Sequence, residues 1–201
     1  SPGIFARTGV CSVIRDLVVE GLSLDCPACT SNVGGLVGQH GGSIDRVRVE
    51  GVVNAPLAER VGGIAGNVLG SIDRTTAMVT VTGLTSVGGV AGAVYGQVRE
   101  SGSFGTVFGA EQVGGLAGRV RGLVDRCHTQ GKVTAVALPR DALGGLIGFL
   151  DGGQVLDSIA TSAVYRGGGD TGRFAGFVGV GEQSGGVLPT IQRCFAAPQT
   201  V

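Results

Sequence analysis

The sequence predicts an all-β fold, a β-solenoid (β-helix-like) of about seven coils with a repeat of 26–32 residues. Three observations predict it. A glycine-rich hexapeptide recurs along the chain, a second constant element follows most of its copies, and no stretch shows a sustained helical apolar period. One repeat is too short to bury its own apolar face, so successive units must stack. Residues 1–201 are therefore expected to form a single repeat domain.

The hexapeptide is clearest at 33–38, where it reads Val-Gly-Gly-Leu-Val-Gly. Four close copies and a degraded one follow, and a weaker copy opens the chain, so that coils start near residues 3, 35, 63, 89, 115, 145 and 176. The repeat glycines are Gly34, Gly35, Gly38, Gly62, Gly63, Gly66, Gly88, Gly89, Gly92, Gly114, Gly115, Gly118, Gly144, Gly145, Gly148, Gly176 and Gly179.

These glycines are expected to be structural. Glycine is needed where the chain turns with φ > 0, or where stacked backbones come so close that a Cβ would clash in every coil. The alternative is a phosphate-binding loop, which requires a strand, a loop and a helix with a following Lys-Ser/Thr. The sequence lacks that context.

The second element is Gly-Ser-Ile-Asp-Arg at 42–46, which is echoed at 70–74 and, as Gly-Leu-Val-Asp-Arg, at 122–126. It predicts a strand, then a corner at which two polar side chains point outward, then another strand. The position after the polar pair is expected to face inward and to form a column through the stack. Its expected members are Leu17, Val47, Thr75, Ser101, Cys127, Ile159 and Cys194.

Composition limits the classes of function. Fifteen basic and fifteen acidic residues give zero formal net charge, and aromatic residues are only 4% of the chain. Nucleic-acid binding is not expected, because there is neither a basic stripe nor a set of aromatic stacking platforms. No apolar run reaches the roughly 20 residues that span a bilayer, so membrane insertion is not expected, and the opening Ser-Pro-Gly is not a signal peptide.

Together, the two elements resemble the GLUG-motif repeat family. The resemblance is carried by Val-Gly-Gly-Leu-Val-Gly, by the following Gly-Ser-Ile, and by a polar turn that ends in Gly131-Lys132-Val133. The family core stands at Gly35 to Gly38, the copy from Gly114 to Val133 is nearest to the family pattern, and six or seven copies cover almost the whole chain.

Members of that family are large secreted or surface-anchored bacterial proteins, including adhesins and immunoglobulin A-cleaving metallopeptidases, in which the repeats form non-catalytic extended segments. The resemblance thus implies an extracellular or cell-surface structural and adhesive module that binds a protein or a glycan on another surface. It brings no catalytic residue, cofactor or metal. Specificity is expected in the insertions at 22–32, 138–142, 165–173 and 181–189.

Two alternatives remain open. Copies could stack end to end into an extracellular filament, because exposed edge strands pair readily with another chain. The chain could also be a carbohydrate-binding or polysaccharide-degrading β-helix, although tryptophan is absent and tyrosine occurs only at positions 95 and 165.

Acidic residues at repeated positions are the first candidates for chemistry. Asp45, Asp73, Asp125 and Asp157 are expected at equivalent places, next to a row formed by Arg46, Arg74, Arg126 and Arg193. Two carboxylates about 5 to 10 Å apart could hydrolyse a glycosidic bond. The simpler interpretation is a solvent-exposed corner whose charges compensate each other. Calcium binding is less favoured, because it needs aspartates at fixed short spacing within each turn.

Cysteines gather in the first repeat. Cys11, Cys26 and Cys29 are expected to hold one disulfide, which would indicate an oxidising compartment. The alternatives are a zinc site with His40, which lacks the ligand spacing of known zinc fingers, and a redox-active Cys-x-x-Cys, which needs a helix N-terminus.

The other cysteines and the histidines suggest no nucleophile. Cys127 and Cys194 are expected in one column but about 10 Å apart, too far for a disulfide, and hence as buried thiols. His40 and His128 are expected at the surface, and neither stands in the sequence context of a hydrolytic triad.

Overall fold

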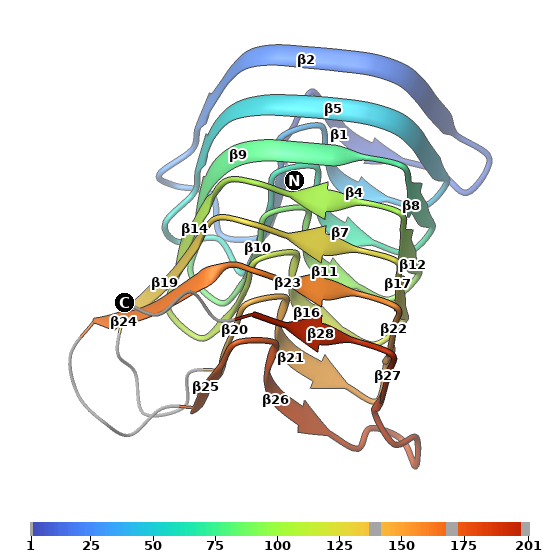
Figure 1. Ribbon diagram of the computed structural model, residues 1–201. Coiled ribbons are helices and arrows are strands. Elements are labelled where there is room, and N and C mark those ends of the chain that lie inside the picture. Colours follow the sequence, from blue (N-terminus) through green and yellow to red (C-terminus); the bar gives the residue numbers. More distant parts are fainter. Residues whose placement is uncertain (1, 137–141, 168–172, 198–201) are drawn as a thin grey trace.

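A computed structural model describes residues 2–136, 142–167 and 173–197 of the chain. These residues form 28 β-strands and no helix, and the strands stack in parallel as a β-solenoid of about six turns, close to the seven expected. Figure 1 shows the coils one above another, with β2 (Val13–Asp25) at one end and β26 (Val178–Glu182) at the other. The prediction of an all-β solenoid is confirmed.

Each turn passes through three parallel sheets. The six-stranded sheet is built from the first half of each hexapeptide. Its strands are β3 (Asn32–Gly34), β6 (Arg60–Gly62), β10 (Ser86–Gly88), β15 (Gln112–Gly114), β20 (Ala142–Gly144) and β25 (Arg173–Ala175).

The seven-stranded sheet follows directly, because the second half of each hexapeptide begins its strands. These strands are β1 (Phe5–Thr8), β4 (Val37–His40), β7 (Ala65–Val68), β11 (Ala91–Val94), β16 (Ala117–Val120), β21 (Ile147–Asp151) and β26.

The fifteen-stranded sheet contains the rest of every turn and is bent at the polar corner. In the first two turns one long strand runs through the corner, and in later turns the strand is interrupted there. Its strands are β2, β5 (Ser43–Asn54), β8 (Ser71–Asp73), β9 (Thr76–Thr82), β12 (Gln97–Arg99), β13 (Gly102–Ser103), β14 (Thr106–Gly109), β17 (Leu123–Asp125), β18 (His128–Thr129), β19 (Lys132–Val136), β22 (Gln154–Leu156), β23 (Ile159–Ala160), β24 (Ala163–Gly167), β27 (Thr190–Gln192) and β28 (Phe195–Ala196).

Strand pairing aligns equivalent positions of successive sequence repeats. Val33 pairs with Val61, Gly34 with Gly62, and the same alignment continues through the stack. Inside the coils, apolar side chains at equivalent positions form continuous columns without solvent exposure. One such column is Leu36, Ile64, Val90, Leu116 and Leu146.

The repeat glycines serve close approach of backbones rather than positive φ. No repeat glycine has φ in the left-handed region. At Gly114 an added Cβ would lie 2.1 Å from the Ala117 carbonyl oxygen of the same coil. It would also lie 2.6 Å from the Gly148 nitrogen and 2.8 Å from the Ile147 Cα, both in the next coil. Backbone atoms cannot yield as the end of a flexible side chain can, so the hexapeptide excludes larger residues by contact.

Positive φ occurs instead at charged residues. One non-glycine residue in every coil has φ between 47° and 54°. In six of the seven cases it is the second residue of a polar pair, and the exception, Asp157, follows Leu156. We call this row, together with the residue before each member, the charged corner. Its positive-φ members are Asp16, Arg46, Arg74, Glu100, Arg126, Asp157 and Arg193.

One coil departs from the expected alignment. Between the paired residues Val120–Leu150 and Leu123–Gln154 the later coil has one extra residue, and Gly152 in that stretch has φ of +70°. Asp157 therefore aligns with the arginines of the charged corner, not with Asp125 as predicted. For the same reason the inward position is taken by Ser158, which is buried, while Ile159, predicted to face inward, is 46% exposed.

Candidate functional site

The charged corner links neighbouring coils through ion pairs. Arg46 Nε lies 2.6 Å from Asp16 Oδ1, and Arg74 Nη2 lies 2.7 Å from Asp45 Oδ1. The same arrangement returns further along, where Arg126 reaches Glu100 at 3.2 Å. Most of these side chains are exposed, although only 15% of the Asp45 side chain is, so water and salt weaken the ion pairs.

The candidate carboxylates of this corner differ in their neighbours and partners. Asp45 is adjacent to Asp73 in the stack, but Asp45 is already bound by two arginines. Asp73 is separated from Asp125 by the coil that carries Arg99. Hydrolysis of a glycosidic bond requires one carboxyl group that stays protonated near neutral pH.

The two pKa shifts resolved at the corner are downward, whereas a general acid needs a raised pKa. The hydrogen bond from Arg46 holds the pKa of Asp16 below its usual value, and the hydrogen bond from Arg193 does the same for Asp157. Both groups are thus carboxylates that compensate charge, which is the behaviour of the charge-compensated corner.

Behind the corner, small polar side chains complete the backbone hydrogen bonds. Ser101 Oγ donates to the carbonyl of Arg99 two residues earlier, at 2.7 Å, and accepts from the Thr75 N–H of the previous coil at 3.1 Å. Ser158 repeats the arrangement toward Leu156 and Cys127. A left-handed residue interrupts strand pairing, and these side chains bond the groups left over.

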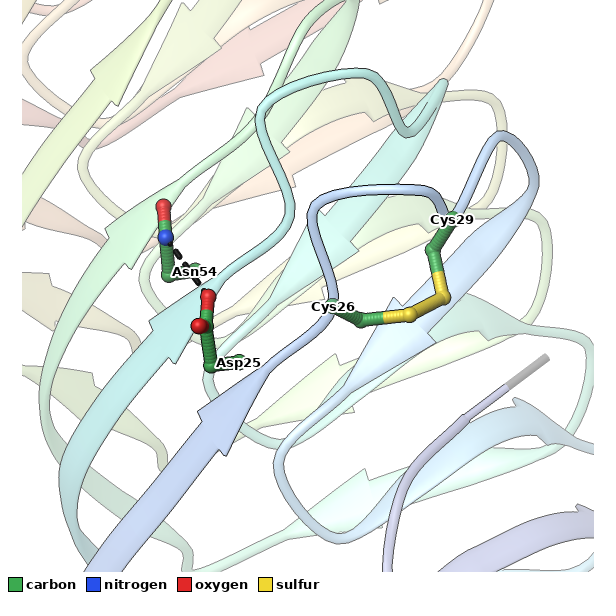
Figure 2. Close-up of a disulfide and its surroundings, with 4 residues drawn as sticks. All are labelled: Asp25, Cys26, Cys29 and Asn54. Carbon is green, nitrogen blue, oxygen red and sulfur yellow. Dashed lines mark hydrogen bonds between the residues drawn. A yellow bond between two sulfur atoms is a disulfide. The ribbon is translucent and has the colours of Figure 1, made fainter.

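The first-repeat cysteines form one bond within the loop between β2 and β3. Cys26 is joined to Cys29, with Cα atoms 5.4 Å apart, and Cys11 is exposed with a free thiol. Figure 2 shows the disulfide beside the hydrogen bond from Asn54 Nδ2 to Asp25 Oδ1, which is 2.8 Å long and joins the first coil to the second. The disulfide thus lies where the long loop begins.

His40 does not reach these cysteines, and the prediction that it lies at the surface is wrong. Its side chain is fully buried in the column that continues into Val68. Nδ1 is 2.8 Å from Thr8 Oγ1 and Nε2 is 3.2 Å from the Ser71 carbonyl oxygen. Burial lowers the pKa of His40, so the ring is neutral at pH 7. Across the described residues, no group of three or more His, Cys, Asp or Glu side chains could hold a metal ion.

The remaining titratable candidates are separate from one another. Cys127 is buried, and burial raises the pKa of its thiol to about 12, so it is not a nucleophile at neutral pH. Cys194 is half-buried rather than fully buried. His128 is exposed, as predicted, with its ring 5.0 Å from that of Phe104.

A cluster around Asp151 was not predicted. Its carboxylate is bound by Arg119 and by Arg121, whose Nε lies 2.7 Å away. Arg121 Nη2 also donates to Ser184 Oγ at 2.6 Å. Burial by itself would raise the pKa of Asp151, but hydrogen bonds from Arg119 and Ser184 and the charges of the two arginines outweigh burial and lower it.

The described surface has several hollows, of which three differ clearly in their lining. The first, about 400 Å³, is almost entirely apolar and lies beside Leu84 and Phe108. The second, about 300 Å³, lies at the charged corner beside Asp45 and Asp73. The third, about 350 Å³, lies where the seven-stranded sheet turns into the fifteen-stranded sheet, and Tyr95 lines it.

The four insertions are only partly described. Residues 22–32 hold the disulfide loop, and residues 181–189 include an antiparallel bridge between Ser184 and Val187. Residues 138–141 and 168–172 lie outside the described residues.

The remaining observations assign no family. Within the described ranges, no helix has the length and apolar character needed to cross a membrane. Comparisons of the chain with protein-family models, with curated proteins and with solved structures found no match.

Proposed function

We propose that this chain is a non-catalytic extracellular module with a structural and adhesive role, a rigid rod or stalk of a bacterial surface or secreted protein. One observation carries the proposal. Every coil pairs in register with its neighbours through three parallel sheets, around apolar columns that run through the stack. Such a molecule resists bending, because each coil is hydrogen-bonded to the next through all three sheets.

Two further features support the proposal. The Cys26–Cys29 disulfide fits an oxidising compartment, since disulfides are rare in the cytosol. Asp45, one of the candidate acids, is bound by Arg46 and Arg74, whereas hydrolysis needs a protonated acid. The resemblance to GLUG-motif repeats agrees with both features.

The decisive test asks where the protein is located and whether it binds surfaces. Antibodies against the purified chain should label intact cells of the source organism, or its culture medium, and the chain should bind surfaces that the organism colonises. Protein found only inside lysed cells would contradict the proposal. Cleavage of polysaccharide by the chain, reduced by Asp73→Asn and Asp125→Asn, would contradict its non-catalytic part.

End-to-end stacking into a filament is the second candidate. Among the described residues β2 pairs only with β5, and at the other end β27 pairs only with β22. An unpaired strand edge can take a further parallel strand. Electron microscopy should then show filaments that grow with protein concentration, and dispersed monomers at high concentration would count against them.

A further inference from the structure

The third hollow is a shallow groove that crosses three consecutive coils. Tyr95 and Gln97 come from the β11–β12 coil, Arg121 from the next, and Gln154 from the third. Gln97, Leu123 and Gln154 are paired in one row, so the two glutamines stand about 10 Å apart along the stack. We call these surroundings the tyrosine groove.

Gly96 and Gly122 line the tyrosine groove with backbone alone, and Leu123 and Val187 add apolar side chains. The N–H groups of the two glycines already donate to the carbonyls of Val68 and Val94, each at 3.1 Å. A peptide therefore cannot add as a β-strand at this place, because no free edge is offered. The polar side chains at the rim must provide recognition.

Arg121 is held in place while its side chain stays partly exposed. Asp151 binds its Nε and Ser184 binds its Nη2, while 46% of the side chain remains exposed. The carboxylate of Asp151 is shared with Arg119, so two positive charges face one negative charge. The neighbouring Glu182 is paired with Arg173. A local positive charge therefore remains at the end of the groove.

The rim combines three kinds of chemistry. Tyr95 provides a half-buried ring, the amides of Gln97 and Gln154 each carry both donors and an acceptor, and Arg121 provides a fixed cation. Sugar hydroxyls likewise donate and accept, sugar C–H faces pack on aromatic rings, and a carboxylate pairs with guanidinium. The spacing of the two amides matches about two linked sugar rings.

We infer that the tyrosine groove binds an oligosaccharide that carries a carboxylate. The inference rests on the proposed adhesive function and names the chemistry of its partner. Tyr95 packs against one sugar ring, Gln97 and Gln154 bond hydroxyls on successive rings, and Arg121 binds the carboxylate. The binding is non-covalent and involves no bond cleavage.

The experiment measures binding of the whole chain to trigalacturonate and sialyllactose, with galactotriose and lactose as neutral counterparts, by isothermal titration and NMR. At least one acidic sugar should bind about tenfold more tightly than its neutral counterpart. Arg121→Gln should remove that preference, and Tyr95→Ala should weaken acidic and neutral sugars alike. Arg126→Gln, at the charged corner, is the matched control and should leave binding unchanged.

Three results would overturn the inference: no binding of either acidic sugar, equal loss of binding in the Arg126→Gln control, or triglutamate binding as tightly as the acidic sugars. Circular dichroism and thermal unfolding verify that each variant is folded. If antibodies detect the chain on intact cells and the chain binds surfaces, but the sugar tests fail, the proposed function still holds. In that case only the tyrosine groove is excluded as the binding site.

Discussion

The glycine hexapeptide and the charged corner both recur once in each coil, yet they meet opposite demands. Hexapeptide glycines have ordinary φ and no room for a side chain, as Gly114 shows by its contacts with the next coil. Corner residues such as Arg74 have φ near +48° and side chains in open solvent. In this solenoid the hexapeptide glycines allow backbones to come into close contact. The left-handed conformation at the corner is adopted by charged residues instead of glycine.

The largest expected loss of stability comes from a substitution in the hexapeptide. Gly114→Ala places a Cβ against backbone atoms of two strands, so we expect a loss of unfolding free energy of about 3 kcal/mol or more. Urea unfolding followed by circular dichroism measures it. Gly9→Ala is the control, because nothing lies within 4 Å of its added Cβ and the loss there should be below about 0.5 kcal/mol. Equal losses at both positions would contradict the close-contact explanation.

The next effect concerns the inner side of the charged corner. Ser101→Ala leaves the carbonyl of Arg99 and the N–H of Thr75 without their buried partner, and should cost about 1–3 kcal/mol. Ser101→Cys should cost less, because Cys127 makes the equivalent bond to the Asp125 carbonyl at 3.4 Å. If Ser101→Ala proved as stable as the wild type in urea unfolding, the hydroxyl would have no role in supporting the corner.

Charged side chains are stable at the exposed corner, but protonation of the buried His40 should destabilise the fold. His40 has a pKa lowered by burial from 6.5, so the unfolded chain takes up a proton that the folded chain resists. Stability is therefore complete above pH 6.5 and falls below it, by at most about 1.4 kcal/mol per pH unit until the folded pKa is reached.

Comparison of unfolding free energies at pH 7.5 and about pH 5.5 tests this sign. His40→Val replaces the ring with the residue that continues its column at position 68, and the part of the acid sensitivity that His40 causes should disappear. The same pH dependence in wild type and variant would assign the effect to other groups.

The smallest expected effect measures the backbone strain at the charged corner. Arg74→Ala and Arg74→Gly both lose the ion pair with Asp45, but only glycine relieves φ of +48°. The glycine variant should therefore be more stable than the alanine variant by about 1 kcal/mol. Thermal unfolding of the two variants decides it, and a more stable alanine variant would show that the corner carries no backbone strain.

The repeat register could be predicted because the hexapeptide appears in nearly every coil, and the alignment of Val33 with Val61 and Val87 in the sheets follows directly from it. The placement of Asp157 failed because alignment by residue type concealed the one-residue insertion at Gly152. The burial of His40 could have been found by placing it in the column of Val68, where every later member is apolar or glycine.

The Asp151 cluster and the tyrosine groove could not be predicted. Arg121, Asp151 and Ser184 are 30 to 63 residues apart in sequence, and none belongs to a constant repeat position. Only the stacking of three coils and the return of the 181–189 segment over them bring these side chains into contact. Sequence distance carries no signal for such a site when no motif marks it.

The sequence by itself determined the period, the all-β class and the positions where a side chain is excluded, since these depend on local pattern repeated in every coil. The tertiary structure alone decided which residues take positive φ, which cysteines pair, and where polar side chains meet across coils. The physical reason is that a solenoid repeats its backbone faithfully, whereas its surface sites depend on single residues that each coil places beside a different neighbour.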